Sequence, residues 1–198
     1  VELTRRGIKI NWDIRTRVNT VDEEILKALK GAGCQRIHYG VEAGTQKILD
    51  VLRKGITLEM VEKAFELTKK AGIEALAYFM IGSPTETKED ILQTINFMKK
   101  INPDYVHITI ATPYPATDLY RMGLEQKVLP RDYWREFAEN PISDFKPYFW
   151  EKELSKEELF SLLKKAYRSF YFRPSYILKR IFRVKSPGEL LIKAKAAL

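Results

Sequence analysis

The stretch Ala75–Thr87, which reads ALAYFMIGSPTET, constrains the fold more than any other part of the chain. It begins as an unbroken apolar run and stops at the Gly-Ser-Pro tripeptide that follows Ile81. A continuous apolar run of this length, closed by Gly and Pro, is typical of a strand buried on both faces of a helix-covered parallel sheet. The loop after such a strand lies at the carboxyl edge of the sheet, where parallel α/β folds bind their ligands. We therefore expect a functional edge at Ile81–Glu86.

The size and composition of the chain describe one globular domain, or one domain with an appendage. It has 198 residues, of which 45% are hydrophobic and 30% are charged, as is usual for soluble proteins. No stretch approaches ~20 uninterrupted apolar residues, and no signal-peptide pattern opens the chain, so we expect a cytoplasmic protein. The chain begins at Val1, without Met, inside a charged segment, and we expect it to be a piece of a longer protein.

Metal ligands are scarce in this sequence. The chain has one cysteine, Cys34, and two histidines, His38 and His107. One cysteine excludes an internal disulfide and a four-thiolate site within the chain. We expect Cys34 to be a small buried residue at a helix–strand corner, and we assign no metal ligand and no catalytic residue to this chain.

The positive charge is concentrated at the carboxyl end. The net charge is +8. Residues 164–198 carry ten Lys or Arg and one acid, Glu189, so residues 1–163 are close to neutral. The basicity therefore belongs to a tail and not to the expected site.

Apolar segments with the period of a strand alternate with segments that have the period of a helix. The predicted strands are residues 8–18, 37–42, 75–81 and 105–112. Thr20, Thr57 and Thr87 are predicted to cap the intervening helices, and Ala32-Gly33 and Ala71-Gly72 to end two of them. Strands that start roughly every ~30–40 residues with helices between them indicate βαβ units, and hence a parallel α/β sheet.

The first predicted strand, residues 8–18, has a polar face that includes Arg15 and Arg17. Two explanations compete, because this face either lines a wet lumen or belongs to a strand at the edge of the sheet. We prefer the lumen, since the arginines lie at the carboxyl end of the strand.

Polar and turn residues converge on one rim, because the carboxyl ends of parallel strands meet at one edge. A Glu and an Arg on one rim are suited to bind the amine and the carboxylate of an amino acid. Alternatively, Glu42 is merely solvated and Glu86 stabilises the start of the next helix. The residues alone indicate a small-molecule site of unassigned chemistry. The candidate site residues are Arg17, Glu42, Ile81, Gly82, Glu86, Thr112, Pro113 and Tyr114.

Four segments, taken together, resemble the core of radical S-adenosylmethionine (SAM) enzymes. They are CQRIHYGVEAG at 34–44, Lys54-Gly55, GSPTET at 82–87 and TPYPATDLY at 112–120. In that family the corresponding elements are G-(V/I/F)-E-S-G, a K-G pair, G-x-P-G-E-T and P-Y-P-G-T, in this order. The resemblance covers about residues 8–122. Ala43, Thr85 and Ala116 depart from it, since the family usually has Ser at the first position and Gly at the other two.

The resemblance implies a six-stranded (β/α) barrel, of which this chain supplies the last four strands. The family's CxxxCxxC loop, which holds a [4Fe–4S] cluster, has no counterpart here. The first two strands and the cluster ligands would therefore lie outside this chain, which would be inactive alone. We divide the chain into a partial barrel, residues 1–122, and an aromatic and basic helical extension, residues 123–198, with helices after Ser155, Pro174 and Ser186.

In the intact enzyme, the resemblance implies reductive cleavage of SAM to methionine and a 5′-deoxyadenosyl radical. Arg17 would bind the methionine carboxylate, and Glu42 the ribose or the methionine amine. Ile81, Gly82 and the strand end Thr112–Tyr114 would hold the adenine. The tail FYFRPSYILKRIF at 170–182 resembles cobalamin-binding radical enzymes of the magnesium-protoporphyrin monomethyl ester oxidative cyclase type. Cobalamin, bound by a domain outside this chain, is thus a further implied cofactor, and the reaction would be that of an oxidoreductase or a methyltransferase.

Other interpretations remain open from the residues alone. The basic tail is suited to bind RNA or an anionic membrane surface, or it is a solvated helix face that packs on the barrel. A third interpretation is a plain α/β ligand-binding domain without enzymatic activity. The free edge at 8–18, where the missing part of the barrel should pair, also favours a homodimer.

Overall fold

A computed structural model describes residues 2–182. Strands and helices alternate along most of the chain, and a mainly helical region follows the last strand. The strands are β1 (Trp12–Thr16), β2 (Cys34–Glu42), β3 (Glu74–Ile81) and β4 (Tyr105–Ile110). The helices are α1 (Glu2–Arg5), the 3-10 turn η1 (Val18–Thr20), α2 (Glu23–Gly31), α3 (Gln46–Val51), α4 (Leu58–Lys70), α5 (Lys88–Ile101), α6 (Asp118–Glu125), α7 (Tyr133–Glu139), α8 (Lys156–Tyr171) and α9 (Pro174–Ile181).

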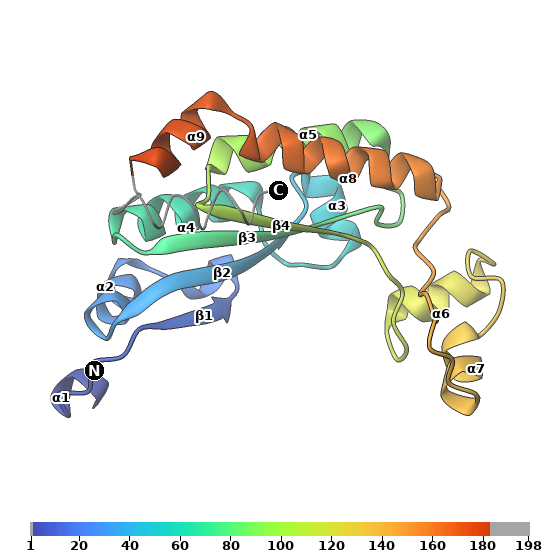
Figure 1. Ribbon diagram of the computed structural model, residues 1–198, viewed down its shortest axis with the longest axis horizontal. Helices are drawn as coiled ribbons and strands as arrows, with labels where there is room; N and C mark the ends of the chain where they lie inside the picture. The colour runs from blue at the N-terminus through green and yellow to red at the C-terminus, as the bar shows by residue number, and fades with distance from the viewer. Residues whose placement is uncertain (1, 183–198) are drawn as a thin grey trace.

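The four strands form one parallel sheet in the order β1-β2-β3-β4. Helices α4, α5 and α8 lie on one side of this sheet, and the opposite side is open between α1 and α7 (Figure 1). The predicted parallel α/β architecture is therefore confirmed. The four strands form a partial barrel, because the sheet does not close on itself.

The two faces of the sheet differ in composition. On the covered face, alternate residues of β2, β3 and β4 such as Tyr39, Phe79 and Ile108 are almost fully buried. The other face, here called the uncovered face, carries half-buried or exposed residues at the alternating positions: Asp13, Arg15, Arg36, His38, Gly40, Glu74, Leu76, Tyr78, Met80, Tyr105, His107 and Thr109.

The prediction that 75–81 is buried on both faces is therefore wrong for one face. The burial of β3 alternates strictly, with Ala75, Ala77, Phe79 and Ile81 buried and the residues between them only half-buried. The reason is that apolar side chains line both sides of this strand, but helices of residues 2–182 cover only one of them. Leu76 and Met80 thus form an apolar part of the uncovered face.

The first strand is shorter than predicted. Ile8 and Ile10 are 44% and 47% exposed, because the register begins where Trp12 pairs with Cys34 and the preceding residues have no partner strand within residues 2–182. β1 lies at the edge of the sheet. Its polar side belongs to the uncovered face. The edge explanation is therefore confirmed for residues 2–182, and the lumen stays a prediction. The prediction for Cys34 is confirmed, since it is fully buried at the start of β2.

Most predicted helix ends are confirmed. Thr87 forms a complete capping box with Asp90, and Thr57 accepts from the N–H of Met60. One cap is wrong: Asp22, and not Thr20, precedes α2 and accepts from the backbone N–H of a residue in its first turn. Thr20 instead closes η1 by donating its hydroxyl to the carbonyl of Arg17 at 2.7 Å.

The region after β4 is more helical than expected. α6 was not predicted, and the proposed domain boundary at 122/123 falls inside it. The aromatic stretch that follows contains α7, and α8 and α9 lie where helices were predicted, with Pro174 at the start of α9. The predicted helix after Ser186 lies outside the described residues. Within residues 2–182, no helix is both long and apolar enough to cross a membrane.

Candidate functional site

Glu42 ends β2 in a conformation that is unusual for its residue type. A bulge between Gly40 and Glu42 shifts the register with β3, and Glu42 has φ 73°. Left-handed φ values in non-glycine residues are uncommon and cluster at functional sites. The bulge turns the carboxylate toward Lys54, whose Nζ donates to Oε1 at 2.7 Å. Both side chains are mostly shielded, with 26% and 17% of their surfaces exposed.

Gly40 makes room for this ion pair. A Cβ at Gly40 would lie 2.7 Å from Oε1 of Glu42 and 3.1 Å from Nζ of Lys54, so any larger residue would displace the charged groups. Arg17 joins the pair from the end of β1, because its guanidinium donates to the backbone carbonyl of Lys54. The Glu42–Lys54–Arg17 cluster thus places one carboxylate and two cations at the carboxyl ends of β1 and β2.

Sequence reasoning found two members of this cluster and missed the third. Lys54 entered only as half of the Lys-Gly pair, without a role. It lies 12 residues after Glu42, in a loop that no periodic pattern positions. The sequence signal for its position is Gly55, whose φ of 63° lets the loop return over the strand ends.

Glu86 lies beside the end of β3 but faces into the protein. It is fully buried, and its Oε2 accepts from the backbone N–H of Ser83 at 2.9 Å. Burial raises the pKa of the Glu86 carboxyl to about 7, against the lowering effect of hydrogen bonds from Ser83 and Gly82. Within residues 2–182, the other oxygen, Oε1, has no hydrogen-bond partner. Glu86 thus stabilises the turn that precedes α5, which differs from the alternative above, in which it stabilises the start of that helix.

Two other predicted site residues at this strand end are also buried. The carbonyl of Ile81 accepts from the N–H of Ala111 at 2.8 Å. Gly82 has φ 78°, and a Cβ there would lie 2.8 Å from Cδ2 of Leu159 in α8. The glycine therefore serves the close approach of α8 as well as the turn.

The end of β4 is partly closed by α7. The carbonyl of Pro113 accepts from the Tyr133 hydroxyl at 3.0 Å and from the Trp134 indole at 3.1 Å. Thr112 donates its hydroxyl to the carbonyl of Ile110 at 3.1 Å. Tyr114 is 54% exposed, with its ring 5.7 Å from that of Trp134. Of the predicted residues here, Tyr114 is the most accessible to a ligand.

The two residues that replace family glycines adopt glycine-like conformations. Thr85 has φ 64° and Ala116 has φ 61°, in the left-handed region that favours glycine. Both turns therefore keep the backbone path that a glycine would take. The replacement of glycine by Thr85 and Ala116 therefore changes the side chain at each turn but not the path of the backbone.

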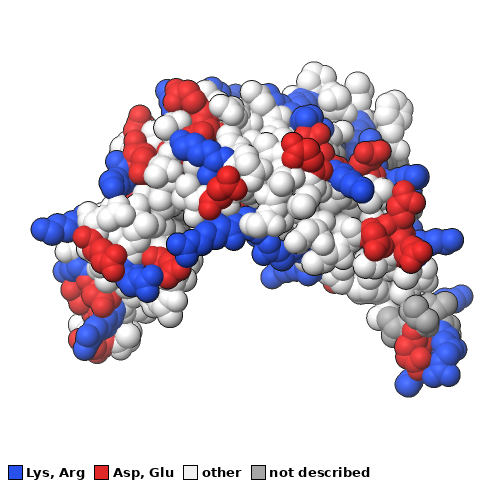
Figure 2. All heavy atoms as spheres, turned by 180° about the vertical axis from the view of Figure 1, so that it is seen from behind, with Lys and Arg blue, Asp and Glu red and all other residues white. Residues whose placement is uncertain are grey.

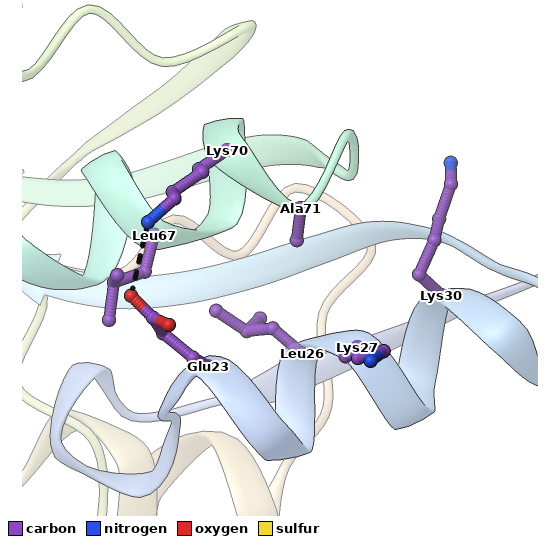
Figure 3. Close-up of a pocket in the computed structure, with 7 residues that line it drawn as sticks. All are labelled: Glu23, Leu26, Lys27, Lys30, Leu67, Lys70 and Ala71. Atoms are coloured by element: carbon purple, nitrogen blue, oxygen red, sulfur yellow. Dashed lines mark hydrogen bonds and ion pairs between the residues drawn. The ribbon is translucent and has the colours of Figure 1, made fainter.

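The described part of the chain also has hollows outside this rim, and two of them lie between helices. One of about 290 Å³ separates α2 from α4, with Leu26 and Leu67 in its floor and the Lys70–Glu23 ion pair across it at 3.3 Å (Figure 3). A larger one of about 620 Å³ lies between the end of α3, the turn at Pro84 and α6. Both lie between surface elements, away from the uncovered face.

The described part of the chain offers no set of metal ligands. Within residues 2–182, no three His, Cys, Asp or Glu side chains are grouped so that they could hold an ion. Cys34 lies at the amino end of β2, away from Glu42 at the carboxyl end. An iron–sulfur cluster therefore does not fit the residues of this chain alone.

The sequence matches known proteins over most of its length. Residues 1–98 match the model of the radical SAM superfamily. The chain is 38% identical to an uncharacterized methyltransferase of Pyrococcus horikoshii, over 92% of this chain and 39% of that protein. It is 31% identical to the anaerobic magnesium-protoporphyrin IX monomethyl ester cyclase of Rubrivivax gelatinosus, over 89% of this chain and 31% of that protein. The chain thus spans less than two-fifths of the length of these relatives.

The fold has counterparts among solved structures. The radical S-adenosylmethionine methyltransferase TsrM from Kitasatospora setae superimposes with a TM-score of 0.56 at 21% identity, over 63% of this chain and 26% of that chain. This similarity concerns the fold, and it agrees with the parallel partial barrel described above. On the sequence match and the fold together, the chain belongs to the radical SAM superfamily.

Proposed function

We propose that this chain is the C-terminal part of the catalytic barrel of a radical SAM enzyme, and that its rim binds part of SAM. The Glu42–Lys54–Arg17 cluster carries the proposal. The amino-acid end of SAM has one ammonium and one carboxylate. The cluster offers one carboxylate and two cations, and the absence of a side chain at Gly40 leaves room for the Glu42–Lys54 pair. The residues present therefore fit the methionine moiety.

Each member of the cluster has a distinct proposed role. Arg17 binds the methionine carboxylate, because a guanidinium can bind it with two parallel hydrogen bonds. Glu42 accepts from the amine or from the ribose hydroxyls. Lys54 holds Glu42 in place before the ligand arrives and offers a second cation to the carboxylate afterwards.

The adenine side is proposed at the ends of β3 and β4. Backbone atoms of Ile81 and Gly82 would bound the base on one side, and the strand end Thr112–Tyr114 on the other. The exposed ring of Tyr114 is suited to stack on adenine, since aromatic rings favour offset stacking. Glu86 would act indirectly, by holding the turn in which Gly82 lies.

The cluster ligands and the first two strands of the barrel are proposed to lie outside this chain and to meet it at β1. SAM bound near a reduced [4Fe–4S] cluster supplies the radical chemistry of the superfamily, and this chain binds, orients and shields the cofactor. The reaction class is that of a methyltransferase or an oxidoreductase such as a cyclase, as in the relatives. A cobalamin cofactor held by another domain and a cytoplasmic location are parts of the same proposal.

Isothermal titration of the whole protein with SAM tests these roles. We expect Arg17→Ala and Glu42→Gln each to weaken binding by at least about tenfold, since each removes a hydrogen bond to a charged group. Lys54→Gln should weaken it less. Arg121→Ala and Glu125→Gln on the exposed side of α6 are matched controls that should bind normally. Unchanged affinity in Arg17→Ala and Glu42→Gln would contradict both assignments.

Iron reconstitution tests the location of the cluster. The 198-residue chain should show no four-iron absorption band and no cleavage of SAM, because one cysteine cannot replace the three thiolates of the family's loop. A stable four-iron cluster on this chain would refute the proposal.

The alternative of an RNA-binding or membrane-binding tail has less support. Several tail cations already bind the protein itself: Arg173 bonds the carbonyl of Lys99, Lys179 pairs with Asp104 at 3.2 Å, and Arg180 bonds Tyr105. Acidic side chains are interspersed with basic ones over the face seen in Figure 2. Salt-dependent RNA binding that disappears when residues 164–198 are deleted would favour this alternative.

A further inference from the structure

Four side chains form a continuous row across the uncovered face, apart from the rim. Nε2 of His38 in β2 lies 3.5 Å from Oδ2 of Asp13 in β1. On its other side, Nδ1 of His38 lies 3.3 Å from the hydroxyl of Tyr78 in β3. The ring of Tyr78 meets the ring of His107 in β4 edge-on, with 5.4 Å between the centroids. One residue from each strand thus contributes to the row.

His38 is half-buried in the row, and Asp13 at one end is more accessible. The His38 side chain is 15% exposed, against 44% for Asp13. Its Nε2 is buried and makes no hydrogen bond within normal limits in residues 2–182. Because Nε2 faces a carboxylate, its proton is best placed there, and this leaves the Nδ1 lone pair to accept from the Tyr78 hydroxyl. A carboxylate behind an imidazole also stabilises the imidazolium that forms when the ring takes up a proton.

The surroundings of Tyr78 indicate what the row can bind. Leu76 and Met80 flank it on the same strand face and are half-buried. Because the Tyr78 proton is directed to His38, the phenol oxygen presents its free lone pairs away from the imidazole. It is therefore suited to accept a proton from an N–H or O–H group of a molecule whose body is apolar.

We infer that Asp13, His38 and Tyr78 form a base relay for a substrate with an apolar body and an ionisable N–H or O–H group, bound on the uncovered face. The inference rests on the proposed function, in which this face is the inside of the barrel. Tyr78 is the catalytic residue, and His38 and Asp13 are positioning residues that act through it.

The relay moves one proton and no electrons. The substrate N–H or O–H bond breaks and its proton goes to the Tyr78 oxygen. The phenolic proton moves to Nδ1 of His38, which becomes an imidazolium. Asp13 stays ionised and balances the new charge. Solvent later removes the proton from the imidazolium.

Other charged groups near the row are few. Arg15 pairs in register with His38 on the side of β1, and Arg36 lies 3.8 Å from the same oxygen of Asp13. Glu74 binds Arg36 at 2.7 Å and so draws that guanidinium toward the amino end of the sheet. No helix of residues 2–182 covers His38 from the uncovered side, so β1 and β3 supply the groups that face it.

A pair of probes that differ only by an O-methyl group tests the inference on the 198-residue chain, without SAM or a cluster. 4-Nitrophenol has an ionisable O–H and absorbs differently when ionised, and 4-nitroanisole lacks that proton. We expect 4-nitrophenol to bind about tenfold more tightly, with an increase in the absorbance of the phenolate at fixed pH. Equal affinity for the two probes, or binding without the absorbance change, would overturn the inference.

Variants locate the effect. Tyr78→Phe and His38→Gln should abolish both the preference and the absorbance change, and Tyr148→Phe, a tyrosine outside the sheet, should keep them. Thermal unfolding monitors the fold of each variant, and the comparison of probes on the unaltered chain holds even if one variant fails to fold. A preference that persists in a folded Tyr78→Phe variant would overturn the inference. Because no step uses SAM, this outcome is independent of the titrations that test the proposed function.

Discussion

The two halves of the sheet differ in how they end. In the half formed by β3 and β4, the strand ends and the outer edge are closed by later parts of the chain, including Leu159 against Gly82 and Tyr133 on Pro113. In the half formed by β1 and β2, the rim holds a charged cluster, and the outer strand has no neighbour beyond it within residues 2–182. In the part of the chain that the structure describes, the same parallel sheet is thus closed on one side and open on the other.

The edge of β4 is closed by two tyrosines of α8. The Tyr171 hydroxyl accepts from the N–H of Val106 at 3.0 Å and donates to its carbonyl at 2.8 Å. The Tyr167 hydroxyl does the same with Ile108, at 2.9 and 3.1 Å. Side chains therefore satisfy the backbone groups that another strand would otherwise bind, which removes the tendency of a free edge to pair.

The edge of β1 has no such cover. Among residues 2–182, β1 pairs with β2 and with no other strand, and no helix of this region runs along its outer side (Figure 1). The comparison favours the proposal that a further strand pairs with β1 and that none pairs with β4. This direction agrees with the proposal that the first strands of the barrel lie outside this chain.

Removing the two hydroxyls of α8 should have the largest effect. The double variant Tyr167→Phe/Tyr171→Phe leaves four partly buried backbone groups without partners, at roughly 1–3 kcal/mol for each tyrosine. We expect the free energy of unfolding, measured in urea, to fall by about 2–5 kcal/mol. Amide exchange at Val106 and Ile108 should accelerate.

Tyr148→Phe is the matched control, because no hydrogen bond ties that hydroxyl to the sheet in the described residues. It should change stability by less than about 0.5 kcal/mol. If Tyr167→Phe/Tyr171→Phe is as stable as this control, the two hydroxyls do not stabilise the edge of β4. The proposed difference between the two halves of the sheet would then be wrong.

The buried carboxyl of Glu86 should make the closed half sensitive to pH. Its pKa is about 7 in the folded chain against 4.5 for an unperturbed glutamate, so the folded state binds more protons between these values. Stability therefore falls as the pH rises from about 4.5 to about 7, by about 3 kcal/mol in total.

Urea unfolding at a series of pH values checks this prediction, with Glu86→Gln as the comparison. The difference in free energy of unfolding between the unaltered chain and Glu86→Gln should change between pH 4.5 and about 7 and be constant above pH 7. Glu42→Gln is the control from the open half, where the carboxylate is paired with Lys54. A parallel pH profile for Glu86→Gln and the unaltered chain would contradict the prediction.

Local features of the chain were predictable from the sequence. The capping box of Thr87 and Asp90 spans four residues, and the alternation of β4 follows from its own side chains. The parallel direction of the strands also followed, because βαβ units give parallel strands. In these cases neighbours in the sequence determine the structure.

Features that join distant segments were not predictable. The hydroxyls that close β4 come from 59 and 65 residues further along the chain, and no pattern in α8 distinguishes these tyrosines from ordinary core residues. Lys54 meets Glu42 only because a loop folds back. The inward orientation of Glu86 depends on a turn whose conformation its residue types allow but do not require.

Restoring the family glycines should stabilise the closed half slightly. Thr85 has φ 64°. Its N–H donates to Glu153 and its carbonyl accepts from Lys47. Both hydrogen bonds use backbone atoms, so a glycine at this position would keep them. The left-handed conformation costs a non-glycine residue roughly 1–2 kcal/mol, and part of this is offset by the flexibility of an unfolded glycine. Thr85→Gly should therefore raise the free energy of unfolding by up to about 1 kcal/mol. Ser161→Gly, at an exposed position inside α8, should instead lower it, and a fall in both would contradict the argument.

A proline in β1, the open edge of the sheet, should have the smallest effect on stability. It also tests whether this edge pairs with a second copy of the chain. The N–H of Trp12 bonds the carbonyl of Gly33 on the β2 side, so by alternation the N–H of Arg15 points outward. Arg15→Pro removes that outward donor without breaking the ladder, and stability should change by less than about 0.5 kcal/mol. If the free edge pairs two copies of the chain, sedimentation should show self-association that rises with concentration and that this variant loses. Ile14→Pro, which breaks the ladder itself, should unfold the edge, and self-association that persists in a folded Arg15→Pro variant would place the contact elsewhere.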